Sequence, residues 1–136
     1  MFLVDTNIIS ESRKGARANA GVLRFFRATD DDQMYIAVQT VGEIRRGVEN
    51  VRGRGDAAQA KTLESWLDGV VRNYAERILD FDMECAQVWG RLMANGNHSP
   101  VDKQIAAVAL IHDLTVVTRN TGDFEGCGCR LVNPFN

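Results

Sequence analysis

Phe2-Leu3-Val4-Asp5-Thr6-Asn7-Ile8-Ile9 opens this chain and decides its fold. A short, continuous apolar run such as residues 2–4 is typical of a strand that is covered on both faces. Thr6 and Asn7 are favourable residues for capping a helix, and Ile8 and Ile9 follow them as its first apolar positions. A buried strand that passes directly into a helix predicts an α/β fold, with Asp5 at the junction.

The same alternation of apolar strands and amphipathic helices continues along the rest of the sequence. Further strands are predicted at residues 34–38, 77–81, 114–118 and 130–132, helices through residues 22–26, 39–50, 56–74, 82–93 and 101–112, and a loop over residues 95–100. Strands separated by helices predict a mostly parallel sheet, because a parallel pair needs a crossover connection. No internal repeat, low-complexity tract or linker interrupts the pattern, so we expect a single domain over residues 1–136.

The overall charge of the chain gives no sign of a polyanionic partner. Its formal net charge is -2, whereas nucleic-acid-binding domains are typically basic. The basic residues are clustered in two places, with Arg13, Lys14, Arg17, Arg24 and Arg27 in the first cluster and Arg45, Arg46, Arg52 and Arg54 in the second. Each cluster is either a solvated helix face or a track for backbone phosphates, and the sequence alone leaves both interpretations open.

The cysteines and histidines do not indicate a site of their own. Cys85 falls on an apolar helical face, where it is expected to be a small core residue. Cys127 and Cys129 could form half of a zinc site, but no second Cys/His pair has ligand spacing. His98 and His112 show no pattern of a nucleophile system, and the sequence contains no Gly-rich phosphate loop.

Neither secretion nor membrane insertion is indicated by the sequence. The N-terminus lacks the charged segment and the long apolar segment of a secretory signal. No apolar stretch approaches the roughly 18 residues that a transmembrane helix needs. We therefore expect a cytoplasmic protein without membrane contact.

Four acidic residues, Asp5, Glu43, Asp102 and Asp123, lie where predicted elements meet loops. Asp5 and Asp123 follow predicted strands, and the other two lie at or near the starts of helices. Sites in open parallel sheets form beyond the carboxyl ends of the strands, so these carboxylates could gather into an all-oxygen pocket for a hard divalent cation. Taken singly, each has an ordinary structural explanation as a helix cap, a first-turn acid or a turn residue.

Small residues beside these acids favour the clustered interpretation. Gly47 lies one turn after Glu43 in a predicted helix, where glycine costs about 1 kcal/mol relative to alanine. We interpret it as a point of close approach that clears space beside Glu43. Ala106 and Ala107, one turn after Asp102, would let their helix pack tightly and bring its N-terminus near the sheet.

Several short motifs, in their order along the chain, resemble the PIN domain. They are Val4-Asp5-Thr6-Asn7, Glu43-Ile44-Arg45-Arg46-Gly47, Asp102-Lys103-Gln104-Ile105-Ala106-Ala107, Thr118-Arg119-Asn120-Thr121-Gly122-Asp123-Phe124 and Asn133-Pro134-Phe135. Each motif is short, but the ordered set spans residues 2–135 and most resembles the VapC toxins of bacterial toxin–antitoxin pairs, in their FitB-like branch. The resemblance implies a three-layer α/β/α PIN-like fold with a mostly parallel sheet of about five strands.

The resemblance also implies a catalytic metal site that binds magnesium or manganese. Its ligands are expected to be Asp5, Glu43, Asp102 and Asp123, with Asp5 and Asp102 central. Which of these acids acts as general base stays open.

Polar residues around the acids are expected to support the site. By the same resemblance, Thr118 and Asn120 are supporting polar residues, and Thr6 and Asn7 orient Asp5. Lys103 departs from the family, which often has a small residue after the aspartate. We expect its side chain to point outward, or to add a cation near the phosphate.

The function implied by the resemblance is that of a magnesium-dependent endoribonuclease, the toxin of a type II toxin–antitoxin pair. Such an enzyme hydrolyses RNA phosphodiester bonds through a metal-activated water. The implied partners are a cognate antitoxin, an RNA substrate such as tRNA or ribosomal RNA, and a second copy of the chain in a homodimer. Promoter DNA would be contacted through the antitoxin. The alternatives are a PIN nuclease that cuts DNA or processes RNA without a toxin role, and a non-catalytic α/β binding module.

Overall fold

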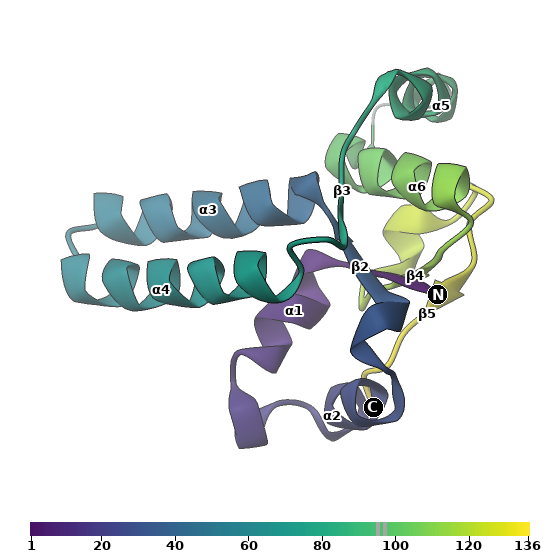
Figure 1. The fold of residues 1–136 in the computed structure, drawn as a ribbon. Helices are drawn as coiled ribbons and strands as arrows, with labels where there is room; N and C mark the ends of the chain where they lie inside the picture. Colours follow the sequence, from purple (N-terminus) through teal and green to yellow (C-terminus); the bar gives the residue numbers. More distant parts are fainter. Residues whose placement is uncertain (95, 97) are drawn as a thin grey trace.

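A computed structural model of the chain, which describes residues 1–94, 96 and 98–136, shows a five-stranded sheet with helices on both faces (Figure 1). The strands are β1 (Phe2–Val4), β2 (Met34–Ala37), β3 (Ile78–Leu79), β4 (Thr115–Val117) and β5 (Leu131–Val132). They are ordered β3-β2-β1-β4-β5, and every pair is parallel. The prediction of a mostly parallel sheet of about five strands is confirmed.

The order of the strands places β1 at the centre of the sheet. The direction in which successive strands are added along the sheet reverses beside β1. From β1 the chain builds outward through β2 and β3, and then returns to add β4 on the other side. Val4 is level with Val117 in the pairing of β1 with β4, so the residues that follow these two strands emerge side by side. Ligand sites of open α/β sheets form at such a reversal point.

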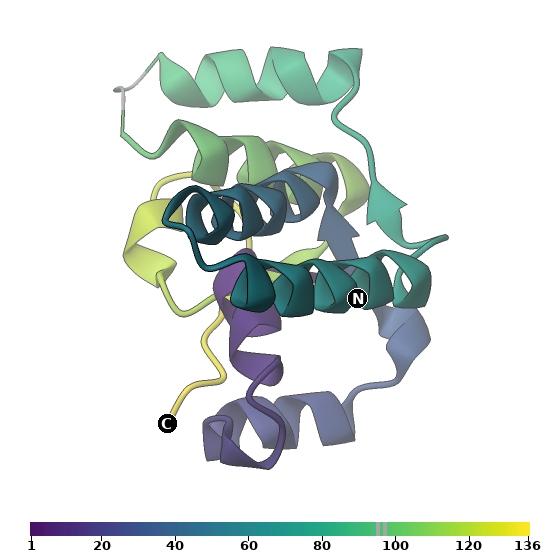
Figure 2. The same cartoon turned by 90° about the vertical axis from the view of Figure 1, so that its left-hand side faces the viewer.

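The helices divide into two groups, one on each face of the sheet, as Figures 1 and 2 show. They are α1 (Thr6–Ser12), α2 (Ala20–Ala28), α3 (Val38–Gly53), α4 (Ala57–Asn73), α5 (Met83–Met93) and α6 (Pro100–His112). Neighbouring strand residues alternate between the faces, so Leu3 packs with the core beneath α5 and α6, and Val4 packs with the core beneath α1 to α4. Two apolar cores around one sheet make the three-layer α/β/α arrangement that the resemblance implied.

The helices α3 and α4 form an arm that extends away from the sheet (Figure 1). Apolar residues of both helices, such as Ile44 and Leu67, are buried between the arm and the sheet. Asp56 caps α4 by accepting a hydrogen bond from the Gln59 backbone N–H, as its position in the sequence predicts. Val71 is 38% exposed although its neighbour Val70 is buried, because the buried face of α4 runs through Leu67, Val70 and Tyr74.

The cap of the first helix differs from the prediction. Asp5, rather than Thr6 or Asn7, is the N-cap of α1, with extended backbone angles and a carboxylate that accepts from the Thr6 N–H. Thr6 is the first residue of the helix. The physical reason is that Asp5 still belongs to the extended strand end, where its side chain reaches forward over the first turn.

Several element boundaries differ from the prediction by a few residues. The strand predicted over residues 34–38 ends at Ala37, and α3 covers Val38–Gly53 rather than residues 39–50. The edge strand β3 pairs on one side only, and it is shorter than residues 77–81. The helix predicted from residue 101 begins at Pro100, since proline suits the first helical position. The loop predicted over residues 95–100 includes Asn95 and Asn97, which lie outside the described residues.

Among the described residues, no helix is both long and apolar enough to cross a membrane.

Candidate active site

The candidate site is built on Asp5, where β1 passes into α1. Only 4% of Asp5 is exposed, and three groups hold its carboxylate. The Thr6 backbone N–H donates to Oδ1 at 2.8 Å, the Thr118 hydroxyl donates to Oδ2 at 2.8 Å, and the Asn7 side-chain amide donates to Oδ2 at 3.3 Å. The carboxylate is therefore fixed in one orientation at the carboxyl end of the central strand.

Thr118 and Asn7 tie the ends of β1 and β4 together. Thr118 follows β4 and is fully buried, and its Oγ1 also accepts from the Asn7 amide at 3.3 Å and from the Asn120 backbone N–H at 3.1 Å. The side-chain oxygen Oδ1 of Asn7 accepts from the Arg119 backbone N–H at 3.1 Å. The Asn7 side chain thus donates to Asp5 and accepts from the segment that follows β4. These bonds hold the ends of β1 and β4 in position relative to each other.

Glu43 is brought to the site by the second turn of α3. Its Oε1 accepts from the Thr6 hydroxyl at 2.6 Å, and the Thr6 oxygen lies 3.2 Å from the Thr40 hydroxyl. One hydroxyl hydrogen cannot serve both contacts, so with Thr6 donating to the carboxylate, Thr40 donates to Thr6. Thr40 is only 1% exposed. A chain of two hydroxyls therefore connects the buried side of α3 to the Glu43 carboxylate.

Thr40 was not predicted as a site residue. It continues the buried face of α3 with Ile44, Val48 and Val51, whereas its neighbour Val41 is half-buried. A threonine one helical turn before an inward isoleucine was the available signal, because a buried hydroxyl needs a hydrogen-bond partner.

Asp102 and Asp123 approach the site from the other face of the sheet. Asp102 lies in the first turn of α6, and Asp123 lies in the short 3-10 helix η3 (Thr121–Phe124) that follows β4. The two carboxyls are close enough for the charge of Asp123 to contribute to the raised pKa of Asp102. Asp5, Thr6, Asn7, Glu43, Asp102 and Asn120 together line a pocket of about 300 Å³. The structure thus brings all eight predicted site residues to one end of the sheet.

Burial and mutual repulsion raise the pKa values of the carboxyls in this pocket. Burial, followed by the negative charges of Asp5, Asp123 and Glu43, raises the pKa of Asp102 to about 7. Burial also raises the pKa of Asp5, although its three donors oppose the shift. The pKa of Glu43 is raised by desolvation, and the Thr6 hydroxyl opposes that change. Acids held together at such a cost are typical of a site that a cation would stabilise.

The donor chemistry fits a hard divalent cation that keeps part of its water shell. Every polar side-chain group that lines the pocket offers oxygen, with only the Asn7 and Asn120 amides adding nitrogen. Within the described residues, no three acidic, histidine or cysteine side chains converge tightly enough to enclose an ion. Magnesium suits such a site, because it retains several waters and needs only one or two direct carboxylates.

Two expectations about neighbouring residues are answered by the structure. Gly47 makes no close approach, since a Cβ built there would meet no atom within 4 Å. It borders an open groove instead, so the close-approach interpretation is wrong. Lys103 turns back along α6, and its ammonium donates to the backbone carbonyl of His98. Its side chain therefore points away from the pocket, as in the first of the two expectations for Lys103.

The comparison with protein families matches the PIN domain over residues 2–125. Two curated relatives align with nearly the whole chain and nearly their own whole length. The plasmid stability protein StbB of Pseudomonas syringae pv. tomato is 35% identical, covering 99% of both chains. The VapC ribonuclease Y4jK of Sinorhizobium fredii is 33% identical, covering 99% of this chain and 98% of its own.

A third relative has a solved structure. Toxin FitB of Neisseria gonorrhoeae is 31% identical over the full length of this chain and 99% of its own. The crystal structure of FitAcB from the same organism superposes with a TM-score of 0.87 at 30% identity, covering 98% of both chains. The sheet order and the helices described above are therefore those of a known architecture.

Proposed function

Because this chain belongs to the PIN-domain family, in the branch of the VapC and FitB toxins, we propose that it is a magnesium-dependent endoribonuclease. The observation that carries the proposal is the hydrogen bond from the Thr118 hydroxyl to the Asp5 carboxylate. It lies at the carboxyl ends of β4 and β1, where the strand order reverses. Around this pair the fold gathers three further acids from α3, α6 and η3. The relative named a VapC ribonuclease supports RNA as the substrate class.

The acids divide their work according to how they are held. Asp5 is fixed by three donors, so it offers a carboxylate of constant position at the floor of the pocket. Asp102, half-buried on the opposite side, offers the second anchor, and these two residues are the proposed central ligands. Glu43 and Asp123 are more exposed. They complete the site from its rim, where they can orient water.

A bound magnesium or manganese ion would neutralise charge on the phosphoryl oxygens and activate the attacking water. The polar residues of the pocket hold the acids in position for this reaction. Asn7 and Thr118 hold Asp5, Thr6 holds Glu43, and Asn120 lines the same pocket. By the family resemblance, we propose direct attack by water rather than a covalent enzyme intermediate.

The biological setting follows from the relatives. We propose that the chain is the toxin of a type II toxin–antitoxin pair in the cytoplasm, restrained by a cognate antitoxin. By the family resemblance it would form a homodimer, and the complex would contact promoter DNA through the antitoxin. The curated toxin FitB and the solved FitAcB structure are the comparisons that support this setting.

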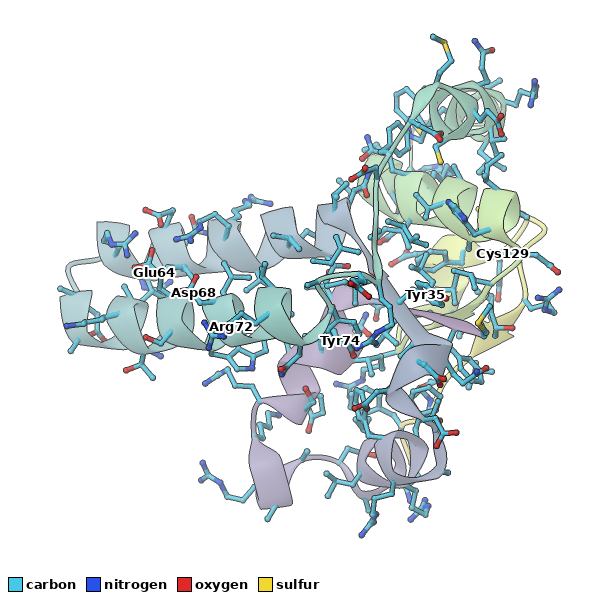
Figure 3. The ribbon with its side chains drawn as sticks, viewed as in Figure 1. Tyr35, Glu64, Asp68, Arg72, Tyr74 and Cys129 are labelled. Atoms are coloured by element: carbon cyan, nitrogen blue, oxygen red, sulfur yellow. The ribbon has the colours of Figure 1, made fainter. Side chains whose placement is uncertain are left out.

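The test compares RNA cleavage by the wild type and by Asp5→Asn. Total RNA is incubated with each protein and magnesium, and new RNA ends are mapped by sequencing. Wild type should produce discrete new ends that vanish with EDTA and in Asp5→Asn. The matched control is Asp68→Asn, which removes an exposed acid of α4 labelled in Figure 3 and should cleave as wild type does. Equal cleavage by wild type and Asp5→Asn would contradict the proposal.

A further inference from the structure

Arginines of the two basic clusters differ in their partners, and Arg45 and Arg52 are those paired with acids in the second cluster. In the second cluster, Arg45 lies 2.5 Å from Glu64 and 3.2 Å from Glu49, and Arg52 pairs with the same two acids. The pairs with Glu64 join α3 to α4, and Figure 3 shows Glu64 between the two helices. The hydrogen bonds from Arg45 and Arg52 lower the pKa of Glu64. The charges of these two arginines are therefore largely balanced within the arm.

Arg13, in the first cluster, is held by an aromatic ring rather than by an acid. Its Cζ lies 5.8 Å from the centre of the Trp66 ring. In the part of the chain that the structure describes, Arg13 forms no ion pair. It borders a groove of about 270 Å³ that Thr6 and Glu43 also border. The guanidinium is thus available to a ligand next to the Glu43 part of the acid pocket.

The positive charge continues beyond Arg13, away from the acids. Arg13, Lys14 and Arg17 together line a second hollow, of about 420 Å³. Lys14 is paired with Glu11 at 2.9 Å, whereas Arg17 has no ion-pair partner among the described residues. A charged polymer that reaches the pocket along the groove would therefore meet further cations beyond it.

Arg119 repeats the same arrangement beside Asn7 and Asn120. Its backbone N–H donates to Asn7, and its Cζ lies 4.6 Å from the centre of the Phe135 ring. Hydrogen bonds from Lys14 and from the Asn19 backbone N–H lower the pKa of Glu11, and the charge of Arg119 contributes to this shift. No ion pair of Arg119 is found among the described residues. The Arg119 guanidinium is therefore also available to a ligand, beside the part of the acid pocket that Asn7 and Asn120 line.

We propose that Arg13 and Arg119 bind backbone phosphates of the RNA next to the acid pocket, with Arg17 extending this track. The inference rests on the proposed ribonuclease function. Four carboxylates repel a polyanion, so phosphates flanking the scissile bond need cations close by. The guanidinium fork matches a phosphate in two hydrogen bonds, and its stacking on an aromatic ring limits the freedom lost on binding. Both arginines meet these requirements, and Arg45 and Arg52 do not.

The test measures RNA binding without turnover. A fluorescein-labelled, mixed-sequence single-stranded RNA of about 20 nucleotides is titrated with protein in EDTA, over about 50 to 200 mM salt. Arg13→Gln and Arg119→Gln should each weaken binding about tenfold and flatten the plot of log affinity against log salt by about 0.7. Arg45→Gln removes the same charge from the arm and is the matched control, which should stay within about twofold of wild type. Arg119→Lys should restore the salt slope but only part of the affinity.

Three outcomes would overturn the inference. Wild-type affinity and slope in both glutamine variants would show that no phosphate binds there. Equal weakening by Arg45→Gln would show a general charge effect. Loss of antitoxin binding with unchanged RNA binding would assign the arginines to a protein partner. The inference fails separately from the proposed function, because the first two outcomes leave magnesium-dependent cleavage by the wild type intact.

Discussion

Thr40 illustrates how far the site depends on groups that carry no charge. Its hydroxyl contacts Thr6, and Thr6 in turn donates the 2.6 Å hydrogen bond that places the Glu43 carboxylate. Because Thr40 is buried, it cannot contact the substrate or the metal directly. Its expected role is to position Glu43 through Thr6.

Replacing Thr40 by valine should therefore weaken metal binding without unfolding the protein. Valine keeps the branched shape but leaves Thr6 without its donor, and a lost hydrogen bond of about 1 kcal/mol corresponds to roughly fivefold weaker binding. Manganese affinity, measured by calorimetry, is the readout. Thr40→Ser retains the hydroxyl and should bind within about twofold of wild type. Wild-type affinity in the valine variant would exclude this positioning role.

Asp102 predicts a dependence of stability on pH. Its pKa is raised from 3.8 to about 7 in the folded, metal-free protein. A raised carboxyl pKa stabilises the fold while the group is protonated, and this contribution is lost as pH rises through the folded pKa. Between pH 4 and pH 8 the metal-free wild type should therefore lose stability relative to Asp102→Asn.

At pH 8, Asp102→Asn should be more stable than the wild type by about 1 kcal/mol, a value reduced to allow for solvent screening of a half-buried group. At pH 4 the two proteins should differ little. Thermal unfolding in EDTA at both pH values is the measurement, with Asp68→Asn as the control for loss of one negative charge. A wild type that equals Asp102→Asn at pH 8 would contradict the repulsion described for the pocket.

At the scale of helices and strands, the sequence was most informative where local chemistry and burial agree. The helices predicted over residues 56–74 and 82–93 begin at Asp56 and Asp82, and both aspartates are N-caps that accept backbone hydrogen bonds. The apolar run of β1 was predicted with its observed bounds. The positions of the acids relative to one another depend on strand order, which only the resemblance could anticipate.

The third helix shows why the rest could not be predicted. Val41 is the more apolar of two neighbouring residues, but the structure buries Thr40 and leaves Val41 half-buried. The rotation of a helix about its axis is set by what it packs against, and the residues that face α3 come from distant parts of the chain. The same limit applies to Gly47, because a glycine in a helix can indicate either close packing or an open groove.

Gly47→Ala should stabilise the protein by about 0.5 to 1 kcal/mol. The added methyl meets no atom within 4 Å, so only the gain in helix propensity remains. Urea unfolding of the metal-free protein measures the change. Gly42→Ala, at another open position of the same helix, should give a similar gain. A loss of stability at position 47 alone would reveal an unrecognised contact.

At the scale of the whole molecule, the last residues of the chain are hydrogen-bonded to the start of α2. The Asn136 side-chain oxygen accepts from the Gly21 N–H at 3.0 Å, and its backbone N–H donates to Asn19 at 3.2 Å. The Asn19 side chain already caps α2 by accepting from the Gly21 and Val22 N–H groups, so the tail adds a second acceptor at this helix end. The tail also carries Phe135, the ring beneath Arg119.

Gly21 allows this closure because it has no side chain. A Cβ at position 21 would lie 2.0 Å from the Pro134 carbonyl oxygen, which is backbone and cannot rotate away. Gly21→Ala should therefore displace the tail and cost about 2 kcal/mol or more, as overpacking typically does. Thermal or urea unfolding measures the loss, and Gly42→Ala is the control for a glycine with open space. An alanine at position 21 without any loss would show that the tail packs only loosely.

The place of β1 between β2 and β4 has a consequence for synthesis on the ribosome. A chain is synthesised from its N-terminus, so β1, α1 and the arm are made long before β4. Until residues 115–117 appear, one edge of β1 stays unpaired and Asp5 lacks its Thr118 partner. The nascent polypeptide therefore carries an incomplete acid pocket for most of its translation. In the proposed toxin, the active enzyme therefore forms only after almost the entire domain has been made.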